Sequence, residues 1–212
     1  MDNVVFLGIN RSYSIKALDE LKKMNCEILK SHNDKNRFID FPKKYDLGIS
    51  LGYMYLIPPE ELKKSIWINF HPAPLPDYGG RNVAYHAILN KESYFGATIH
   101  YMDENFDGGE IIHTREFKIS KDATSNELYK LACDTSLDLF KEYIPKFLSG
   151  VELKSTKQIN HMYYKKEPIN DFIDIQDDVK RTIRALYYPP YYPKIKIGNK
   201  NFIIKQEIQN DQ

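Results

Sequence analysis

Cysteine is scarce in this chain of 212 residues, which contains only Cys26 and Cys133. Neither belongs to a closely spaced set of the kind that binds zinc, and the two lie far apart in the sequence. This scarcity favours structural thiols in a reducing compartment over a disulfide or a metal site. We therefore expect no metal.

An excess of charge is also missing. The 30 basic and 29 acidic residues give a formal net charge of +1 and are spread along the chain. Such a balance provides no overall attraction for the phosphates of nucleic acid. The composition argues against nucleic acid, including tRNA, as a partner or substrate.

Long hydrophobic segments are absent as well. The apolar run at residues 4–9 is too short for a signal peptide and lacks basic flanks. No run approaches the ~20 residues that cross a bilayer. We expect a soluble cytoplasmic protein that does not bind membranes.

The segment at residues 8–12, where the first expected strand ends, has one glycine, Gly8, whereas dinucleotide-binding folds carry Gly-x-Gly-x-x-Gly there. This difference disfavours a nicotinamide enzyme. The loop nevertheless follows a first strand, where open α/β sheets bind ligands. Gly8, Asn10 and Arg11 are therefore candidates to hold a substrate phosphate through backbone N–H groups and a guanidinium.

Strand and helix patterns alternate along the chain, which predicts an α/β fold: a Rossmann-like, mostly parallel sheet with helices on both sides. The expected strands are residues 4–9, 26–30, 47–51, 65–71, 95–102 and 110–119. The expected helices are residues 12–23, 58–62, 82–90, 124–148 and 174–187. Ile15, Leu18 and Leu21 have helical spacing in the first helix, and Ser125 and Gly150 are the expected cap and stop of the long one. The length suits one domain at residues 1–150, with a C-terminal extension at residues 151–212.

Two polar side chains end an otherwise apolar strand. Asn69 and His71 are two positions apart, so they share a face of the strand, and Pro72 stops the ladder after them. An amide donor beside an imidazole suits a site that holds an oxyanion and moves a proton. The alternative is a strand end with two solvated polar residues.

Further motifs follow in order. INFHPAPLP is succeeded by the strand GATIHYM and then by FDGGEII, which contains Asp107. Together these segments resemble the folate-dependent formyltransferase family, which carries Asn-x-His, Gly-x-Thr-x-His and Asp-x-Gly-x-Ile motifs in this order and spacing. The resemblance covers roughly residues 45–120.

The family implies the formyltransferase fold and a formyl transfer from 10-formyltetrahydrofolate, a co-substrate, to an amine. By resemblance, Asn69 donates to the oxyanion, protonated His71 stabilises it, and Asp107 supports the imidazolium and relays the proton. His100 is expected to orient Asp107, and Thr98 to allow close backbone approach near the pterin. A buried structural histidine is the alternative for His100.

The run at residues 45–58 resembles the family's strand and loop whose backbone lines the pterin slot. The implied cofactor-binding residues are Met54, Tyr55, Leu56, Ile57, Asp103 and Phe106. Without the family, the same run is a buried apolar strand followed by a proline that begins a helix.

Acceptor recognition is expected in the loop after the proline segment, at Tyr78, Arg81 and Asn82. These residues suit an amino sugar on a diphosphonucleoside, and the alternative is a turn with a solvated arginine. The favoured acceptor is a nucleotide-linked amino-dideoxyhexose, dTDP-4-amino-4,6-dideoxyglucose or its 3-amino isomer, of the kind used in O-antigen and lipopolysaccharide biosynthesis.

Other acceptors and a non-catalytic role remain open. Glycinamide ribonucleotide formyltransferases carry a glycine-rich phosphate loop, and methionyl-tRNA formyltransferases a sizeable basic C-terminal domain. Neither feature is found here. A folate- or nucleotide-binding module without turnover is a further alternative.

The C-terminal extension contains an Ile-Arg-Ala-x-x-x-Pro-Pro-Tyr pattern at residues 183–191. This pattern resembles the C-terminal segment of sugar N-formyltransferases, and its alternative role is that of a rigid surface segment packed by tyrosines. The tyrosine–proline run at residues 187–193 is a candidate contact of a homodimer.

Overall fold

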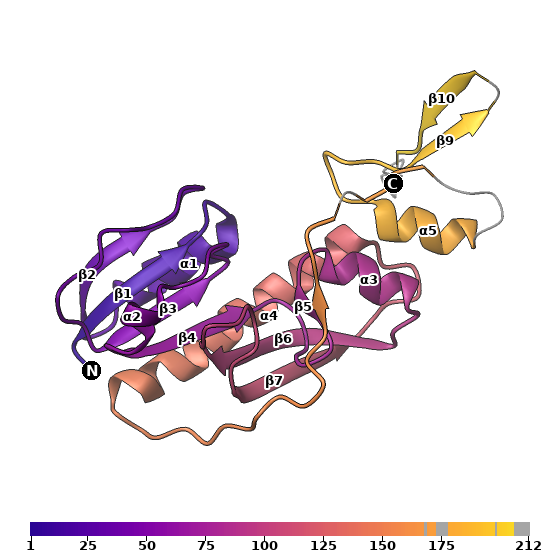
Figure 1. Cartoon of the computed structure of the whole chain (residues 1–212). Helices are drawn as coiled ribbons and strands as arrows, with labels where there is room; N and C mark the ends of the chain where they lie inside the picture. Colours follow the sequence, from indigo (N-terminus) through magenta and orange to yellow (C-terminus); the bar gives the residue numbers. More distant parts are fainter. Residues whose placement is uncertain (168, 173–177, 198, 206–212) are drawn as a thin grey trace, which may run out of the picture.

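A six-stranded sheet forms the centre of the protein, which is described from a computed structural model (Figure 1). The structure describes residues 1–167, 169–172, 178–197 and 199–205. The strand order is β2-β1-β3-β4-β6-β7. The bounds are β1 Asn3–Gly8, β2 Glu27–His32, β3 Leu47–Leu51, β4 Ile66–His71, β6 Tyr94–Tyr101 and β7 Ile111–Lys118. β1 to β4 are parallel, whereas β6 and β7 are antiparallel to their neighbours, so the predicted mostly parallel α/β sheet is confirmed.

Helices cover both faces of this sheet. The bounds are α1 Ser12–Leu21, α2 Pro59–Leu62, α3 Val83–Leu89, α4 Ser125–Leu148 and α5 Val179–Leu186. α1 and α4 bury one face, where Phe6 and Phe70 pack against Phe140 of α4. Val5, Leu7 and Trp67 of the other face pack against the segments on either side of β3. These segments contribute Phe38, Tyr45, Ile57 and, from α2, Leu62. Each fully buried large side chain contributes roughly 2 kcal/mol to folding.

Alternation along β4 decides which side chains reach the core. Ile68 and Phe70 join the cluster under α1 and α4, whereas Trp67 joins the opposite cluster. Asn69 and His71 therefore project from the Trp67 face, as the spacing predicted. β6 pairs with β4 so that His100 lies opposite Asn69 and Thr98 opposite His71.

Two predictions about helices were wrong in detail. Ile15 is 40% exposed, whereas Leu21 is buried as its spacing predicts, together with Tyr13 and Ala17. α4 is capped by Thr124 rather than Ser125, because Thr124 and Glu127 form a reciprocal capping box. The hydroxyl of Ser125 donates to the Tyr187 carbonyl instead.

Gly150 follows α4 with φ +75°, so the predicted stop is confirmed. Beyond it the chain returns along β7 and the loops that precede α3 (Figure 1). There β8 (Tyr163–Tyr164) pairs with β5 (Gly79–Gly80). A boundary between two domains at residue 150 stays a prediction.

The last described elements are α5 and a hairpin of β9 (Lys194–Ile197) and β10 (Lys200–Ile203), which lie at the end of the molecule opposite the N-terminus (Figure 1). Residues 174–177 of the predicted last helix lie outside the described residues. The described helix begins after Asp178, whose carboxylate accepts from the Arg181 N–H.

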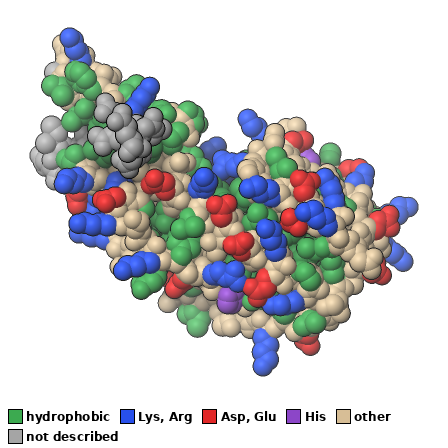
Figure 2. Space-filling view, turned by 180° about the vertical axis from the view of Figure 1, so that it is seen from behind, with side chains coloured by type: hydrophobic (Ala, Val, Ile, Leu, Met, Phe, Trp, Pro, Cys, Tyr) green, Lys and Arg blue, Asp and Glu red, His purple; other side chains and the backbone are tan. Residues whose placement is uncertain are grey.

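Positive and negative side chains are interspersed over the face shown in Figure 2, as the small net charge predicts. Within the described residues, no helix combines the length and the apolar character that crossing a membrane requires.

Candidate active site

Two of the three predicted catalytic residues, Asn69 and His71, face the same carboxylate oxygen of the third, Asp107. Asn69 Nδ2 lies 3.3 Å and His71 Nδ1 3.4 Å from Asp107 Oδ1. Asn69 and His71 come from the end of β4, and Asp107 comes from the turn between β6 and β7. His71 and Asp107 are mostly buried, with 7% and 13% of their side chains exposed. Tertiary folding therefore brings together residues that the sequence separates widely.

The backbone at Asp107 has an unusual conformation. Its φ is +53°, in the left-handed region that few residues other than glycine, asparagine and aspartate adopt. Gly109 follows it, and a Cβ there would lie 1.9 Å from the Tyr101 carbonyl oxygen, so the turn requires glycine. Asp107 Oδ2 accepts from the Gly80 N–H at 2.9 Å. The second oxygen is thus anchored while the first faces Asn69 and His71.

Both ring nitrogens of His71 face acceptors. Nε2 lies 2.8 Å from the Tyr78 carbonyl oxygen, which accepts only, so this nitrogen carries a proton. Nδ1 faces the Asp107 carboxylate. An imidazole placed in this way donates from both nitrogens when it is protonated, and the carboxylate then compensates its charge.

His100 contacts Asn69 rather than Asp107. Its Nδ1 donates to the Tyr101 carbonyl at 2.7 Å, so neutral His100 presents the Nε2 lone pair, which accepts from Asn69 Nδ2 at 3.1 Å. Complete burial lowers the pKa of His100 to about 4, which keeps it neutral near pH 7. Its distance to Asp107 Oδ1 is 3.8 Å, too long for a hydrogen bond. The prediction that His100 orients Asp107 directly is therefore corrected.

Burial by itself would raise the pKa of Asp107. The nearby imidazole of His71 and the Gly80 N–H act in the opposite direction and hold the pKa below its usual range. Asp107 is consequently ionised at neutral pH and can accept a proton or stabilise a cation.

Thr98 is tied to the segment after His71, and its expected role near the pterin stays a prediction. Its buried hydroxyl donates to the Ala73 carbonyl at 2.9 Å and accepts from the Leu75 N–H at 3.0 Å. Thr98 thus holds the proline segment that follows His71, because the register places it opposite His71. A Cβ at Gly96 would clash with the Arg115 backbone of β7, so the close pairing of β6 and β7 requires glycine there.

The predicted cofactor-binding residues divide into exposed and buried ones. Tyr55, Leu56 and Phe106 are 37–40% exposed, and Met54 is partly exposed. Ile57 is 2% exposed, and its side chain packs in the core. Asp103 accepts from the Asn105 N–H at 2.8 Å and thereby shapes the turn that carries Asp107.

The predicted acceptor loop is only partly accessible. Tyr78 is 4% exposed, and its hydroxyl is bonded to Glu92 and Asn90, so the expected contact between its side chain and the acceptor is wrong. Arg81 lies next to the predicted cofactor loop, with Nη1 3.4 Å from the sulfur of Met54. Asn82 precedes α3 with φ +56° and is exposed.

The loop after β1 was predicted to hold the substrate phosphate. The Ile9 N–H donates to Ser14 Oγ at 3.1 Å, which occupies one of the backbone groups expected to hold phosphate. Gly8 is buried and allows Ser14 and Asn33 to approach closely. Asn10 and Arg11 are exposed, and Arg11 Nη1 lies 3.3 Å from the Tyr129 hydroxyl. Arg11 thus remains on the surface near residues of α4.

Sequence reasoning missed Gln158 and His161. Gln158 Nε2 donates to the carbonyls of Asp107 and Gly109 at 2.7 and 2.6 Å, and His161 Nε2 lies 3.2 Å from the Phe106 carbonyl. Tyr163 stacks on Phe106 with ring centroids 6.0 Å apart. No local pattern marks these residues, because they act on backbone atoms about fifty positions away.

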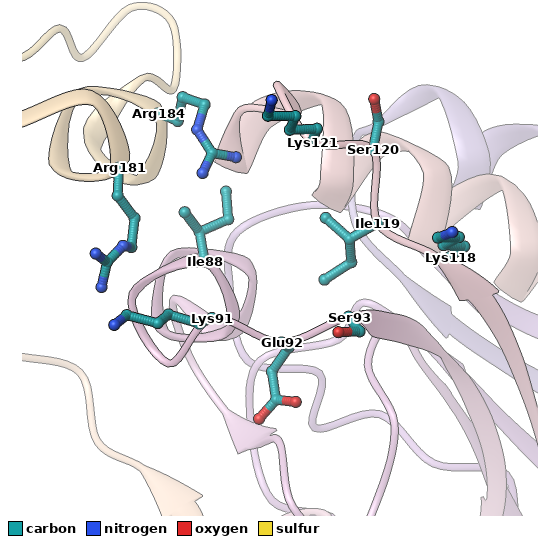
Figure 3. A pocket seen from close by; sticks show the side chains of 10 residues that line it. All are labelled: Ile88, Lys91, Glu92, Ser93, Lys118, Ile119, Ser120, Lys121, Arg181 and Arg184. Atoms are coloured by element: carbon teal, nitrogen blue, oxygen red, sulfur yellow. The ribbon is translucent and has the colours of Figure 1, made fainter. Parts of the chain in front are cut away.

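A hollow of about 240 Å³ lies apart from these residues, between the ends of α3 and β7 and the helix α5 (Figure 3). Half of its lining residues are basic, namely Lys91, Lys118, Lys121, Arg181 and Arg184. The side chain of Glu92 points away from the hollow and accepts from the Tyr78 hydroxyl at 2.7 Å (Figure 3). None of the three converging residues lines it.

The burial of Cys133 agrees with the predicted structural role of the cysteines. Cys133 is 5% exposed, and burial raises the pKa of its thiol to about 12, so it is an unreactive thiol. Cys26 is partly buried, and neither cysteine is in a disulfide.

Comparison with known proteins decides the family. The model of the formyl transferase family matches residues 29–143, which are more than half of the chain and contain the three converging residues. The chain belongs to the formyl transferase family. This membership confirms the resemblance seen in the motifs, and the formyltransferase fold is confirmed by the structural likeness.

Individual formyltransferases are similar over most of their length. GDP-perosamine N-formyltransferase from Brucella melitensis is 29% identical over 204 residues, 92% of this chain and 78% of that protein. An N-formyltransferase from Helicobacter canadensis, crystallised with folinic acid and dTDP-3-aminofucose, superposes with a TM-score of 0.80 at 23% identity over 93% of this chain and 85% of that one. A 4-N formyltransferase from Francisella tularensis has a TM-score of 0.81 at 21% identity over 97% and 98%.

Proposed function

We propose that this formyltransferase moves the formyl group of 10-formyltetrahydrofolate to the amine of a nucleotide-linked amino-dideoxyhexose. The convergence of Asn69, His71 and Asp107 around a single oxygen supports this function most strongly. An amide donor, an imidazole and a carboxylate together meet the needs of acyl transfer to an amine.

In the proposed reaction the neutral amine attacks the formyl carbon. A carbon–nitrogen bond forms to the sugar, and the formyl oxygen becomes an oxyanion that protonated His71 stabilises. Asp107 relays the proton that the amine loses. The carbon–nitrogen bond to the folate then breaks, and the folate nitrogen takes up one proton in place of the one that the amine lost.

The proposed role of Asn69 requires an exchange of partners. Its two N–H groups are directed at His100 Nε2 at 3.1 Å and at Asp107 Oδ1 at 3.3 Å. We expect the longer contact, to Asp107, to be replaced by the formyl oxygen. His100 would keep the amide oriented meanwhile, because its neutral Nε2 can only accept.

We assign the folate to the partly exposed loop of Met54, Tyr55 and Leu56 and to Phe106 beside Asp107. Aromatic and aliphatic side chains around a few polar groups are typical of small-molecule sites. The Helicobacter neighbour was crystallised with folinic acid, which supports a folate co-substrate in this fold.

The nucleotide of the acceptor differs among the relatives. The Brucella protein is named for GDP-perosamine, and the Helicobacter protein was crystallised with a dTDP-linked 3-aminosugar. We favour a dTDP-linked 4-amino or 3-amino sugar with Arg81, Asn82, Asn10 and Arg11 as its contacts. A guanidinium recognises a diphosphate through bidentate hydrogen bonds.

The experiment is a formyl-transfer assay with 10-formyltetrahydrofolate and a panel of dTDP-, GDP- and UDP-linked amino sugars. We expect formation of a sugar formamide and of tetrahydrofolate in equal amounts with one nucleotide class. Turnover only with glycinamide ribonucleotide or methionyl-tRNA would contradict the sugar assignment. Ligand binding without amine-dependent tetrahydrofolate formation would instead indicate a binding module.

We further propose that the protein is a homodimer. The C-terminal hairpin and the turn before it expose Tyr191, Ile197, Phe202 and Ile203, each 47–72% exposed. Exposed apolar side chains gathered at one end of a molecule are typical of protein interfaces.

A further inference from the structure

One segment outside the family motifs holds the turn that carries Asp107. This return segment, residues 155–164, places the Gln158 side chain against the turn. Gln158 Nε2 donates both of its hydrogens, to the Asp107 carbonyl at 2.7 Å and to the Gly109 carbonyl at 2.6 Å. Both N–H groups of the side-chain amide are therefore bonded to the turn, and only its oxygen is left for another partner.

His161 extends this contact. Its Nδ1 lies 3.0 Å from Gln158 Oε1, and its Nε2 lies 3.2 Å from the Phe106 carbonyl. Its ring also packs tightly on the neighbouring loop, since a Cβ at Gly79 would lie 2.6 Å from His161 Cε1. Gln158 thus holds the backbone carbonyls of Asp107 and Gly109. Neutral His161 has one N–H, which donates either to Gln158 Oε1 and orients its amide, or to the Phe106 carbonyl.

The same segment holds the loop that faces Asp107 from the other side. The Met162 N–H donates to the Pro76 carbonyl at 2.9 Å, the Gly79 N–H donates to the Met162 carbonyl at 3.1 Å, and the Arg81 N–H donates to the Tyr164 carbonyl at 2.9 Å. This loop supplies the Gly80 N–H to Asp107 and the Tyr78 carbonyl to His71. One segment therefore connects both supports of the His71–Asp107 pair.

The turn needs such support for a physical reason. Asp107 has a left-handed backbone and is followed by two glycines, whose backbones are the least restricted of all residues. A strained residue persists only where its surroundings over-determine it. The peptide orientation at residues 106–109 sets the direction of the Asp107 carboxylate, and Gln158 and His161 fix that orientation.

We propose that Gln158 and His161 are positioning residues for Asp107, which makes the return segment part of the active-site framework. The proposal rests on the proposed catalytic role of Asp107. A loss of this support displaces the carboxylate without removing any group that contacts the substrate. A displacement of about 1 Å can reduce turnover on the order of a hundredfold.

The test replaces Gln158 with methionine, which has a similar length but no N–H donors. We expect kcat to fall roughly 10- to 100-fold, with KM for both substrates nearly unchanged. Backbone amides of residues 105–109 should exchange hydrogen faster, which is a direct readout of the turn. Lys157→Met is the matched control, since Lys157 is adjacent, exposed and without a described hydrogen bond, and it should leave both readouts unchanged.

A double-mutant cycle separates positioning from a general structural role. In an Asp107→Asn background, Gln158→Met should lower the remaining turnover less than about twofold, because the group it positions is already removed. Full additivity of the two effects would contradict the proposal. His161→Asn provides a second variant if Gln158→Met does not fold, and it should lower kcat in the same direction.

The turnover of Asp107→Asn and of Gln158→Met together distinguishes a failure of the positioning role from a failure of the proposed function. If Asp107→Asn retains normal turnover, the proposed role of Asp107 is wrong whatever Gln158→Met does. If Asp107→Asn is inactive while folded Gln158→Met keeps normal kcat and normal amide exchange, only the positioning role is overturned.

Discussion

Asp107 combines a strained backbone with a side chain that reaches two loops and a strand. Its φ of +53° is tolerated by aspartate and asparagine better than by most residues, so an isosteric replacement can keep the conformation. The carboxylate is held in its ionised form mainly by His71, against the effect of burial. Charge and position can therefore be tested separately at this residue.

Asp107→Asn should abolish most turnover and preserve the fold. The amide keeps the size and the left-handed backbone but cannot compensate an imidazolium or relay a proton. We expect kcat to fall by roughly 10²- to 10⁴-fold, with little change in the thermal midpoint. Asp122→Asn, at an exposed position remote from the site, is the control. Normal activity of a folded Asp107→Asn protein would contradict the proposed chemistry.

At the scale of elements, the face of β4 and the start of α4 have local causes. The β4 alternation was predicted from spacing alone, because a strand has a period of two. The cap of α4 was assigned to Ser125, one residue late, because both residues at this boundary carry hydroxyls. The reciprocal bonds between Thr124 and Glu127 decide in favour of Thr124.

Thr124→Ala should lower the free energy of unfolding by about 1 kcal/mol, the usual contribution of an N-cap. The residue is far from Asp107 in the sequence and has no contact with it, so activity of the folded protein should be unchanged. Urea denaturation measures the effect. Asn126→Ala is the matched control, since this side chain makes no hydrogen bond among the described residues. Equal stability of the two variants would contradict the capping role.

At the scale of the whole molecule, buried histidines link stability to pH. Burial lowers the pKa of His100 from 6.5 to about 4, and it lowers the pKa of His86 as well. The unfolded chain binds protons at these sites first as the pH falls. The contribution of these two groups to stability is therefore fully present above pH 6.5 and is lost as the pH falls towards 4.

For His100 this loss amounts to up to about 3 kcal/mol over that range. His100→Gln removes the titrating group and still offers an oxygen to Asn69. We expect its stability, measured by urea denaturation between pH 7 and 4.5, to depend less steeply on pH than that of the wild type. Parallel pH curves of the two proteins would show that His100 does not contribute.

The proposed homodimer can be tested by substitutions in the C-terminal hairpin. Phe202→Asp places a charge on the exposed apolar face, so we expect it to convert a dimer into a monomer in light scattering after size exclusion. Lys196→Ser on the same hairpin should leave the dimer intact. A wild-type protein that is monomeric at high concentration would contradict the proposed homodimer.

Much of the fold and of the candidate site could be predicted from local patterns. The apolar runs, the alternation of β4 and the three polar residues in their order and spacing are properties of short segments. They were sufficient to predict the sheet, the family and the convergence of Asn69, His71 and Asp107. The backbone periods of strand and helix are intrinsic, and this is the reason why such predictions succeed.

The sequence by itself thus determined which polar residues meet in the candidate site, and that β4 and the turn between β6 and β7 deliver them. Only the tertiary structure decided that Tyr78 turns into the core, that His100 accepts from Asn69, and that Gln158 and His161 hold the Asp107 turn. These contacts join atoms that are distant in sequence, and several involve backbone carbonyls common to every residue. No local pattern can encode such partners, because they exist only once the chain has folded.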